Sequence, residues 1–178
     1  VRKLGKVKMT ILDTDFLSSF FKIRKLKLIL KALNVKHVVV PSTVYEELKE
    51  AQFFNEIASL FAFNEKELNN DRFILVKTVD LVEWKENFTK EETITLGKGE
   101  LGCFILAKNS GDIILIDDQR ARAVAKVKSL KVVSIPSFLL FCKRKNVVSL
   151  DELKQIVNDL KTEDYYEFSE ESRELLLK

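Results

Sequence analysis

The chain has 178 residues, of which 46% are hydrophobic and 32% charged, so it is long enough to bury one sizeable core. Its 30 Lys and Arg nearly balance its 27 Asp and Glu, and it has only 5 glycines and 2 prolines. This composition excludes collagen-like, linker-rich and intrinsically disordered chains, and it predicts a folded protein with mixed surface charge.

The first half of the chain alternates strands with helices. Apolar or β-branched runs predict strands at residues 9–12, 38–40 and 74–76. Apolar side chains at helical spacing predict helices over residues 16–33 and 44–63. The polar stretch 64–72 before the third strand predicts a surface loop.

The second half repeats this pattern. Two further apolar runs predict strands at residues 113–116 and 132–133. Helices are expected at residues 98–108 and 119–130, from Pro136, and after the S-x-x-E capping box at 149–152. Five strands alternating with helices predict an α/β fold with a mostly parallel sheet, helices on both faces and right-handed crossovers.

Cysteine and histidine usage narrows the chemistry. Cys103 and Cys142 lie far apart with no C-x-x-C pair, which fits a reducing cytosol, and His37 is the only histidine. No apolar run approaches the ~18 residues of a membrane span, and the basic residues 1–10 are not followed by the apolar segment of an export signal. We therefore expect a cytoplasmic protein whose hydrolytic chemistry, if any, depends on carboxylates.

Acidic side chains follow two of the predicted strands. Asp13 and Asp15 follow the first strand, and the pair Asp117-Asp118 follows the fourth. The carboxyl ends of parallel strands share one edge of a sheet, which Glu47 and Glu100 could also reach from the helices that carry them. Like charges this close either protonate or hold a hard cation, and oxygen ligands favour Mg²⁺ or Mn²⁺.

Each acid also has an ordinary structural interpretation. Asp13 could be a helix N-cap, and Asp15 a cap or a hydrogen-bond acceptor. Thr43 and Glu46 could form a capping box, which favours Glu47 as the inward-facing glutamate. Glu100 could simply complement a helix dipole. The adjacent Asp117 and Asp118 are the hardest to explain as surface decoration.

Four stretches together resemble the motifs of the PIN domain, and more closely those of prokaryotic PIN proteins related to the toxin nucleases of toxin-antitoxin pairs. They are Ile11 to Leu17, Val40 to Leu48, Gly97 to Glu100 and Leu115 to Arg122. Residues 150–177 resemble the C-terminal helical extension of that group, whereas residues 49–95 match least. Leu101-Gly102-Cys103 departs from the small-residue or acidic run usual after the third motif.

The resemblance implies a PIN-like three-layer sandwich with a five-stranded sheet. Residues 1–148 would form the nuclease domain, and residues 149–178 a helical extension packed on it. The family's metal ligands and catalytic residues fall on Asp13, Glu47, Glu100 and either Asp117 or Asp118.

The activity implied is that of a ribonuclease dependent on Mg²⁺ or Mn²⁺, in which a metal-activated water hydrolyses RNA phosphodiesters. RNA would be the substrate, an antitoxin protein a partner, and a homodimer the assembly. Cationic side chains after the first and fourth motifs could contact the RNA backbone, namely Lys22, Arg24, Lys25, Lys27, Arg120 and Arg122.

Two other functions remain open. A haloacid-dehalogenase-like phosphatase also begins with D-x-D after its first strand, but it has Thr or Val two residues after the second Asp, where this chain has Leu17. A PIN-like module without catalysis, which binds RNA or protein, would carry the same motifs.

Overall fold

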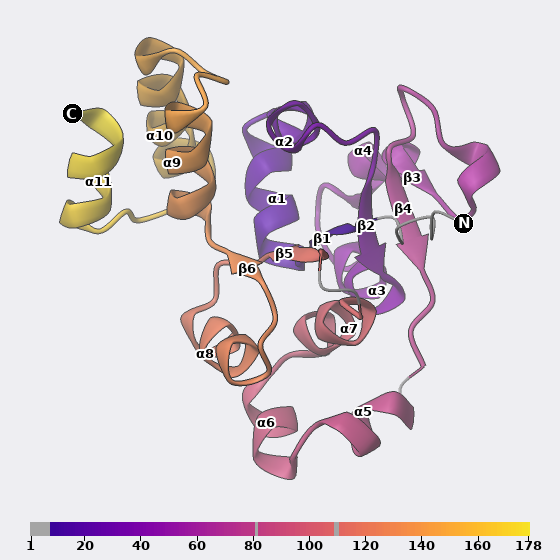
Figure 1. Cartoon of the computed structure of the whole chain (residues 1–178). Helices are drawn as coiled ribbons and strands as arrows, with labels where there is room; N and C mark the ends of the chain where they lie inside the picture. Colours follow the sequence, from indigo (N-terminus) through magenta and orange to yellow (C-terminus); the bar gives the residue numbers. More distant parts are fainter. Residues whose placement is uncertain (1–7, 81, 109–110) are drawn as a thin grey trace, which may run out of the picture.

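The computed structural model describes residues 8–80, 82–108 and 111–178, so the basic segment 1–7 lies outside the described part. The chain forms an α/β fold on one parallel sheet (Figure 1), which confirms the predicted fold class. Its strands run in the order β3-β4-β2-β1-β5-β6. They are β1 (Thr10–Leu12), β2 (Val38–Pro41), β3 (Phe61–Ala62), β4 (Ile74–Lys77), β5 (Ile113–Leu115) and β6 (Val132–Val133).

Helices cover both faces of this sheet. The long helices are α1 (Thr14–Lys22), α2 (Leu26–Leu33), α3 (Ser42–Lys49), α7 (Lys98–Leu106), α8 (Gln119–Val127), α9 (Ile135–Arg144), α10 (Leu150–Glu163) and α11 (Glu170–Leu177). Shorter ones are α4 (Phe54–Ile57), α5 (Val82–Asn87) and α6 (Lys90–Thr95), with 3-10 turns η1 (Ala58–Leu60) and η2 (Glu65–Glu67). Figure 1 shows α1, α2, α9 and α10 above the sheet and α3, α7 and α8 below it. In the described part of the chain, no helix is long and apolar enough to cross a membrane.

The sequence predicts five strands, and the structure has a sixth. β3 falls inside residues 44–63, where a continuous helical region is wrong beyond Lys49. Phe61 and Ala62 are buried and pair with β4 at the edge of the sheet. A strand of two residues shows no alternation, so periodicity cannot separate it from the end of a helix.

The helical stretch 16–33 forms two helices, α1 and α2. The chain turns between α1 and α2 at Arg24, which has a left-handed backbone with φ of 58°. The turn lets both helices lie over the sheet, with Phe16, Phe20 and Ile29 buried beneath them.

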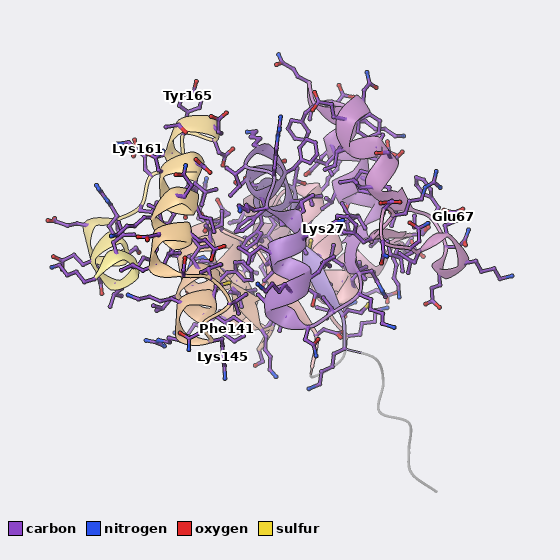
Figure 2. The ribbon with its side chains drawn as sticks, turned by 90° about the horizontal axis from the view of Figure 1, so that it is seen from above. Lys27, Glu67, Phe141, Lys145, Lys161 and Tyr165 are labelled. Carbon is purple, nitrogen blue, oxygen red and sulfur yellow. The ribbon has the colours of Figure 1, made fainter. Side chains whose placement is uncertain are left out.

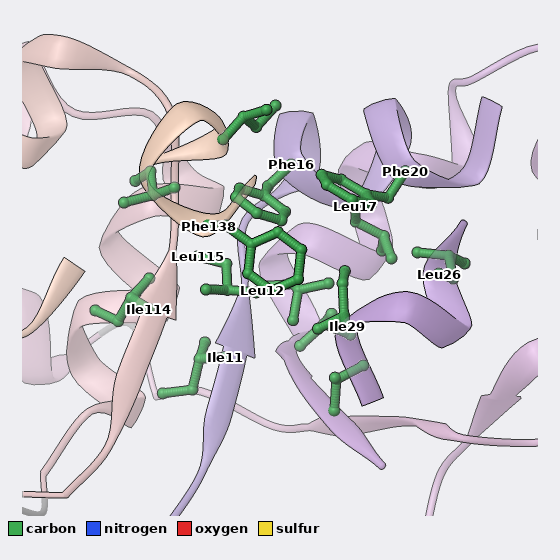
Figure 3. Packing of buried hydrophobic residues seen from close by; sticks show 14 of the residues in the cluster. Ile11, Leu12, Phe16, Leu17, Phe20, Leu26, Ile29, Ile114, Leu115 and Phe138 are labelled. Carbon is green, nitrogen blue, oxygen red and sulfur yellow. The ribbon is translucent and has the colours of Figure 1, made fainter. Parts of the chain in front are cut away.

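Aromatic packing joins the first helix to the last third of the chain. Phe16 and Phe20 stack with ring centroids 5.0 Å apart, and Phe138 of α9 meets them edge-on at 5.9 and 5.4 Å. Figure 3 shows these three rings packed against strand residues such as Leu12 and Leu115. Phe138 and Leu139 are buried in this core.

The C-terminal helices pack onto the same core. Leu153, Ile156 and Leu160 of α10 are buried, and α10 and α11 contact α9. Asp164, just after α10, accepts hydrogen bonds from Ser19 Oγ at 2.5 Å and from Lys22 Nζ at 2.6 Å. The end of α10 is thereby fixed to the side of α1.

We expect Phe138→Ala to lower the free energy of unfolding by about 3–5 kcal/mol, because it opens a cavity beneath two stacked rings. Phe141→Ala on the same helix is the matched control, since its ring is only half-buried and its loss should cost less than half as much. Urea denaturation followed by circular dichroism measures both variants. Equal losses would contradict the packing described here.

Candidate metal centre

Strand pairing brings the acids of the first and fourth motifs together. β1 and β5 are parallel neighbours in which Leu12 lies opposite Leu115. The backbone N–H of Asp13 donates to the carbonyl of Leu115 at 3.1 Å. Asp13 therefore lies one step past the end of β1, on the same sheet edge from which Asp117 and Asp118 follow β5.

Glu47 is held over this edge by two donors. Thr14 Oγ1 donates to Glu47 Oε2, and the backbone N–H of Gly99 donates to Oε1 at 2.9 Å. A methyl group on Gly99 would lie 2.5 Å from Oε2, so the close approach needs a glycine. Glu46 instead pairs with Lys49 in solvent, and no side chain caps α3.

A second glycine on the same face of α7 lets α3 and α7 approach. A methyl group on Gly102 would overlap Thr43 Oγ1 and come within 2.9 Å of the Pro41 ring. Gly102 is therefore required by the contact between α7 and the junction of β2 and α3. The sequence Leu101-Gly102-Cys103, which departs from the usual family pattern, therefore lets α3 pack closely on α7, and this packing brings Glu47 to the start of α7.

Glu100 reaches back over the start of its own helix. Its Oε2 accepts from the N–H of Gly97 at 2.8 Å, as in a capping box. Partial burial raises the pKa of this carboxyl, and the negative charges of Asp118, Asp15 and Glu47 raise it further. The helix-capping and charge-cluster interpretations therefore both hold for this residue.

Asp13 is the most perturbed acid of the set. It is only 3% exposed, it occupies the N-cap position of α1, and its side chain makes no capping hydrogen bond. Burial raises the pKa of Asp13 to about 8, and the charges of Asp15, Glu100 and Glu47 add to the rise. A buried carboxyl with three acidic neighbours is a strong candidate for a cation ligand.

The two adjacent aspartates have different roles. Asp117 Oδ1 accepts from the N–H of Ile135 at 2.9 Å and Oδ2 from the hydroxyl of Tyr166 at 2.8 Å, so both oxygens bind the protein. Asp118 caps α8 through Oδ1, 2.8 Å from the N–H of Ala121, and no described residue donates to Oδ2. Its charge raises the pKa values of Asp15 and Glu100. Asp118 is thus the aspartate that faces the other acids.

The PIN domain family model matches residues 9–178, nearly the whole chain. The chain belongs to the PIN domain family. No match was found among curated proteins or among solved structures. PIN domains are generally nucleases, and they typically bind divalent metal ions.

The chemistry of the PIN acids fits a hard divalent cation, although their present spacing is not a finished coordination shell. Within the described residues, no three Asp, Glu, His or Cys side chains are close enough together to hold a metal as they stand. The charged groups named as acting on the pKa values of Asp13 and Glu100 are all carboxylates. The candidate donors are all carboxylate oxygens, the ligands that a hard cation prefers.

The nearby thiol does not join these donors. Cys103 is buried beneath the acids, and its Sγ donates to the carbonyl of Leu12 at 3.5 Å. Burial raises the pKa of Cys103 well above its ordinary value, and the charges of Asp13, Glu47 and Glu100 raise it further. A neutral thiol is a poor metal ligand, so the donor set remains one of carboxylates.

Reasoning from the sequence missed several residues that hold or flank these acids. Thr14 and Gly99 lie inside the quoted motifs and could have been found as donors near Glu47. Tyr166 and Asp164 carry no local signal, because their partners lie 49 and 145 residues away. For Asp15 the sequence indicates only a cap or a hydrogen-bond acceptor. Its charge acts on Asp13 and Glu100, and burial followed by the charge of Glu47 raises its own pKa.

A cavity of about 580 Å³ lies beside α1, next to Asp118. Its lining includes Asp15, Asp118 and Lys22, together with the segment 164–167 that follows α10. Lys22, which could contact RNA, pairs with Asp164 at 2.6 Å. Among the described residues, Arg122 Nε is buried without a hydrogen-bond partner.

The stability of this PIN domain should fall as pH rises from about 4 to about 8 in a chelating buffer. The Asp13 carboxyl ionises near 3.8 in its ordinary environment but near 8 in the folded protein. The folded state therefore binds more protons between these values, and the free energy of unfolding decreases as that proton is lost.

The Asp13→Asn variant should have a weaker pH dependence, because only Asp15 and Glu100 then keep raised pKa values, and it should exceed the wild type in stability at pH 8. Urea denaturation across the pH range measures both proteins. Parallel curves for the two proteins would show that Asp13 ionises normally.

Proposed function

We propose that this PIN protein is a ribonuclease dependent on Mg²⁺ or Mn²⁺ that hydrolyses RNA phosphodiesters. The observation that carries this proposal is the group of carboxylates on one edge of a parallel sheet, among which buried Asp13 has a pKa of about 8. Membership of a family whose members are generally nucleases supports the same activity.

Four acids would hold the ion: Asp13, Glu47, Glu100 and Asp118. Asp118 is chosen over Asp117 because its charge acts on Asp15 and Glu100, whereas the Asp117 carboxylate holds Ile135 and Tyr166. When bound, such an ion polarises a phosphate and lowers the pKa of a water molecule.

The remaining groups of the chain prepare the carboxylates for this task. Thr14 and the N–H of Gly99 fix both oxygens of Glu47, so this side chain is oriented before any ligand arrives. Burial keeps solvent away from Asp13, which loses its proton when a cation replaces it. The adjoining cavity of about 580 Å³ gives a nucleotide room beside Asp118.

The toxin role, an antitoxin partner and a homodimer remain proposals that rest on the resemblance of the motifs. The phosphatase alternative is weakened by the PIN family match, and an assay with a phosphomonoester tests it directly. A non-catalytic PIN-like module would bind RNA or protein with no effect of metal.

The adjacent aspartates give a charge-matched test of this proposal. We expect Asp118→Asn to weaken Mn²⁺ binding at least tenfold and to abolish cleavage of single-stranded RNA, because the ion loses one carboxylate ligand. Asp117→Asn should bind Mn²⁺ nearly as the wild type does, but it should unfold at lower urea because its bonds to Ile135 and Tyr166 weaken.

Isothermal titration with Mn²⁺, a gel assay of RNA cleavage and urea denaturation measure these properties. A wild type that binds no Mn²⁺ and cleaves no RNA would contradict the nuclease proposal. If Asp117→Asn lost Mn²⁺ binding and Asp118→Asn kept it, Asp117 would be the ligand.

A second test uses the glycine beside Glu47. Gly99→Ala should leave the fold intact, because alanine suits a helix, but its methyl group would displace the Glu47 carboxylate and weaken Mn²⁺ binding about tenfold. Gly97→Ala is the control, since its methyl group would lie at an ordinary 3.8 Å from Glu100 Oε2. Equal Mn²⁺ affinities in the two variants would show that Glu47 is not a ligand.

A further inference from the structure

A second cavity lies on the C-terminal helices, next to the one beside Asp118. It measures about 490 Å³ and is bounded by α10, α11 and the segment between them. Tyr165, Tyr166 and Glu167 line both cavities. Residues 165–167, just after α10, therefore form a ridge between the two cavities.

The two cavities have opposite charge. The cavity beside Asp118 is lined by five acids and one cation, Lys22. The cavity on the C-terminal helices is lined by the cations Lys154, Lys161 and Arg173, with Glu167 as its one acid. All three cations are exposed, and none forms an ion pair with a carboxylate of the described residues. Their charge is available to an anionic ligand.

Tyr165 on the ridge is held in a conformation that its side chain disfavours. It follows the C-cap of α10 with φ of 53°, in the left-handed region where glycine is usual at the end of a helix. Its side chain is 85% exposed, and Figure 2 shows it at the end of α10 near Lys161, projecting away from the ribbon. An exposed aromatic ring on the wall shared by two cavities is available to stack on a flat ligand.

We propose that the cavity between α10 and α11 binds the part of a single-stranded RNA that flanks the cleaved phosphodiester. Lys154, Lys161 and Arg173 contact its phosphates, and Tyr165 stacks one base on the ridge between the two cavities. The inference rests on the proposed nuclease function and adds the site that holds its substrate.

The combination of groups favours RNA over an acidic segment of a protein. Both ligands would satisfy the three cations, but only a nucleic acid offers flat bases to an exposed aromatic ring. The cationic cavity and the cavity beside Asp118 share the residues of this ridge, so one strand that crosses the ridge can occupy both cavities. A continuous path of this kind is expected for a substrate that must present its backbone to the acids.

The first experiment removes the three charges. The variant Lys154→Gln/Lys161→Gln/Arg173→Gln is compared with Lys36→Gln/Lys66→Gln/Lys90→Gln, which changes the net charge equally at exposed positions outside both cavities. Fluorescence anisotropy with labelled oligouridylate in EDTA measures affinity across a salt series. The first variant should bind at least ~10-fold more weakly, with the salt dependence reduced by ~0.7 for each lost phosphate contact. The control should bind as the wild type does.

The second experiment isolates the ring of Tyr165. Tyr165→Gly suits the left-handed backbone, so the folded state should be at least as stable as the wild type, yet it should bind oligouridylate ~10-fold more weakly. Tyr165→Phe keeps the stacking surface and should bind normally. Equal affinities of Tyr165→Gly and the wild type would overturn the stacking role.

Cleavage kinetics separate this inference from the nuclease function itself. With Mn²⁺, the triple variant should lose at least ~10-fold in kcat/KM on a long oligonucleotide but cleave a dinucleotide at the wild-type rate, because only the long substrate reaches the second cavity. Wild-type kinetics on both substrates would overturn the inference and leave the nuclease proposal standing. Binding of a polyglutamate peptide, lost in the triple variant while RNA binding persists, would assign the cavity to an acidic protein segment. A wild type that neither binds nor cleaves RNA would overturn both proposals.

Discussion

The burial of Asp13 beside other carboxylates at one edge of the sheet is the constraint on which the rest of the site depends. The parallel register of β1 and β5 places buried Asp13 on the edge from which Asp118 follows, and the charge of Glu100 acts on Asp13 as well. The pKa of Asp13 rises to about 8, a direct sign that its charged form is disfavoured there. A fold tolerates such a cluster only if the acids stay partly protonated or a cation joins them.

The strand-helix alternation and the acids at the ends of two strands could be predicted from the sequence, because apolar runs followed by polar caps are local signals. Which of Asp117 and Asp118 faces the other acids could not be predicted from the sequence. The two are adjacent, and what separates them is Tyr166, 49 residues further on, whose hydroxyl donates to Asp117. β3 was missed for a similar reason, since Phe61 and Ala62 become a strand only by pairing with β4.

The two glycines of α7 show how close packing between helices positions the side chains of the site. Gly102 allows α7 to lie against Pro41 and Thr43, and one turn earlier Gly99 offers its N–H to Glu47. A side chain at either position would move α7 or Glu47 away from the other. The run after Glu100 that departs from the usual family pattern therefore serves the same site, through close contact between helices.

The C-terminal helices are coupled to the acids through two carboxylates that bind the protein itself. Asp117 joins the start of α9 to Tyr166, and Asp164 joins the end of α10 to Ser19 and Lys22 of α1. Both contacts fix the segment 164–167, which forms one wall of the cavity beside Asp118. Because burial and then the charge of Asp117 raise the pKa of Tyr166, its hydroxyl stays protonated and remains a donor at any physiological pH. The position of this wall relative to the acids is therefore set by the hydrogen bonds of Asp117 and Asp164.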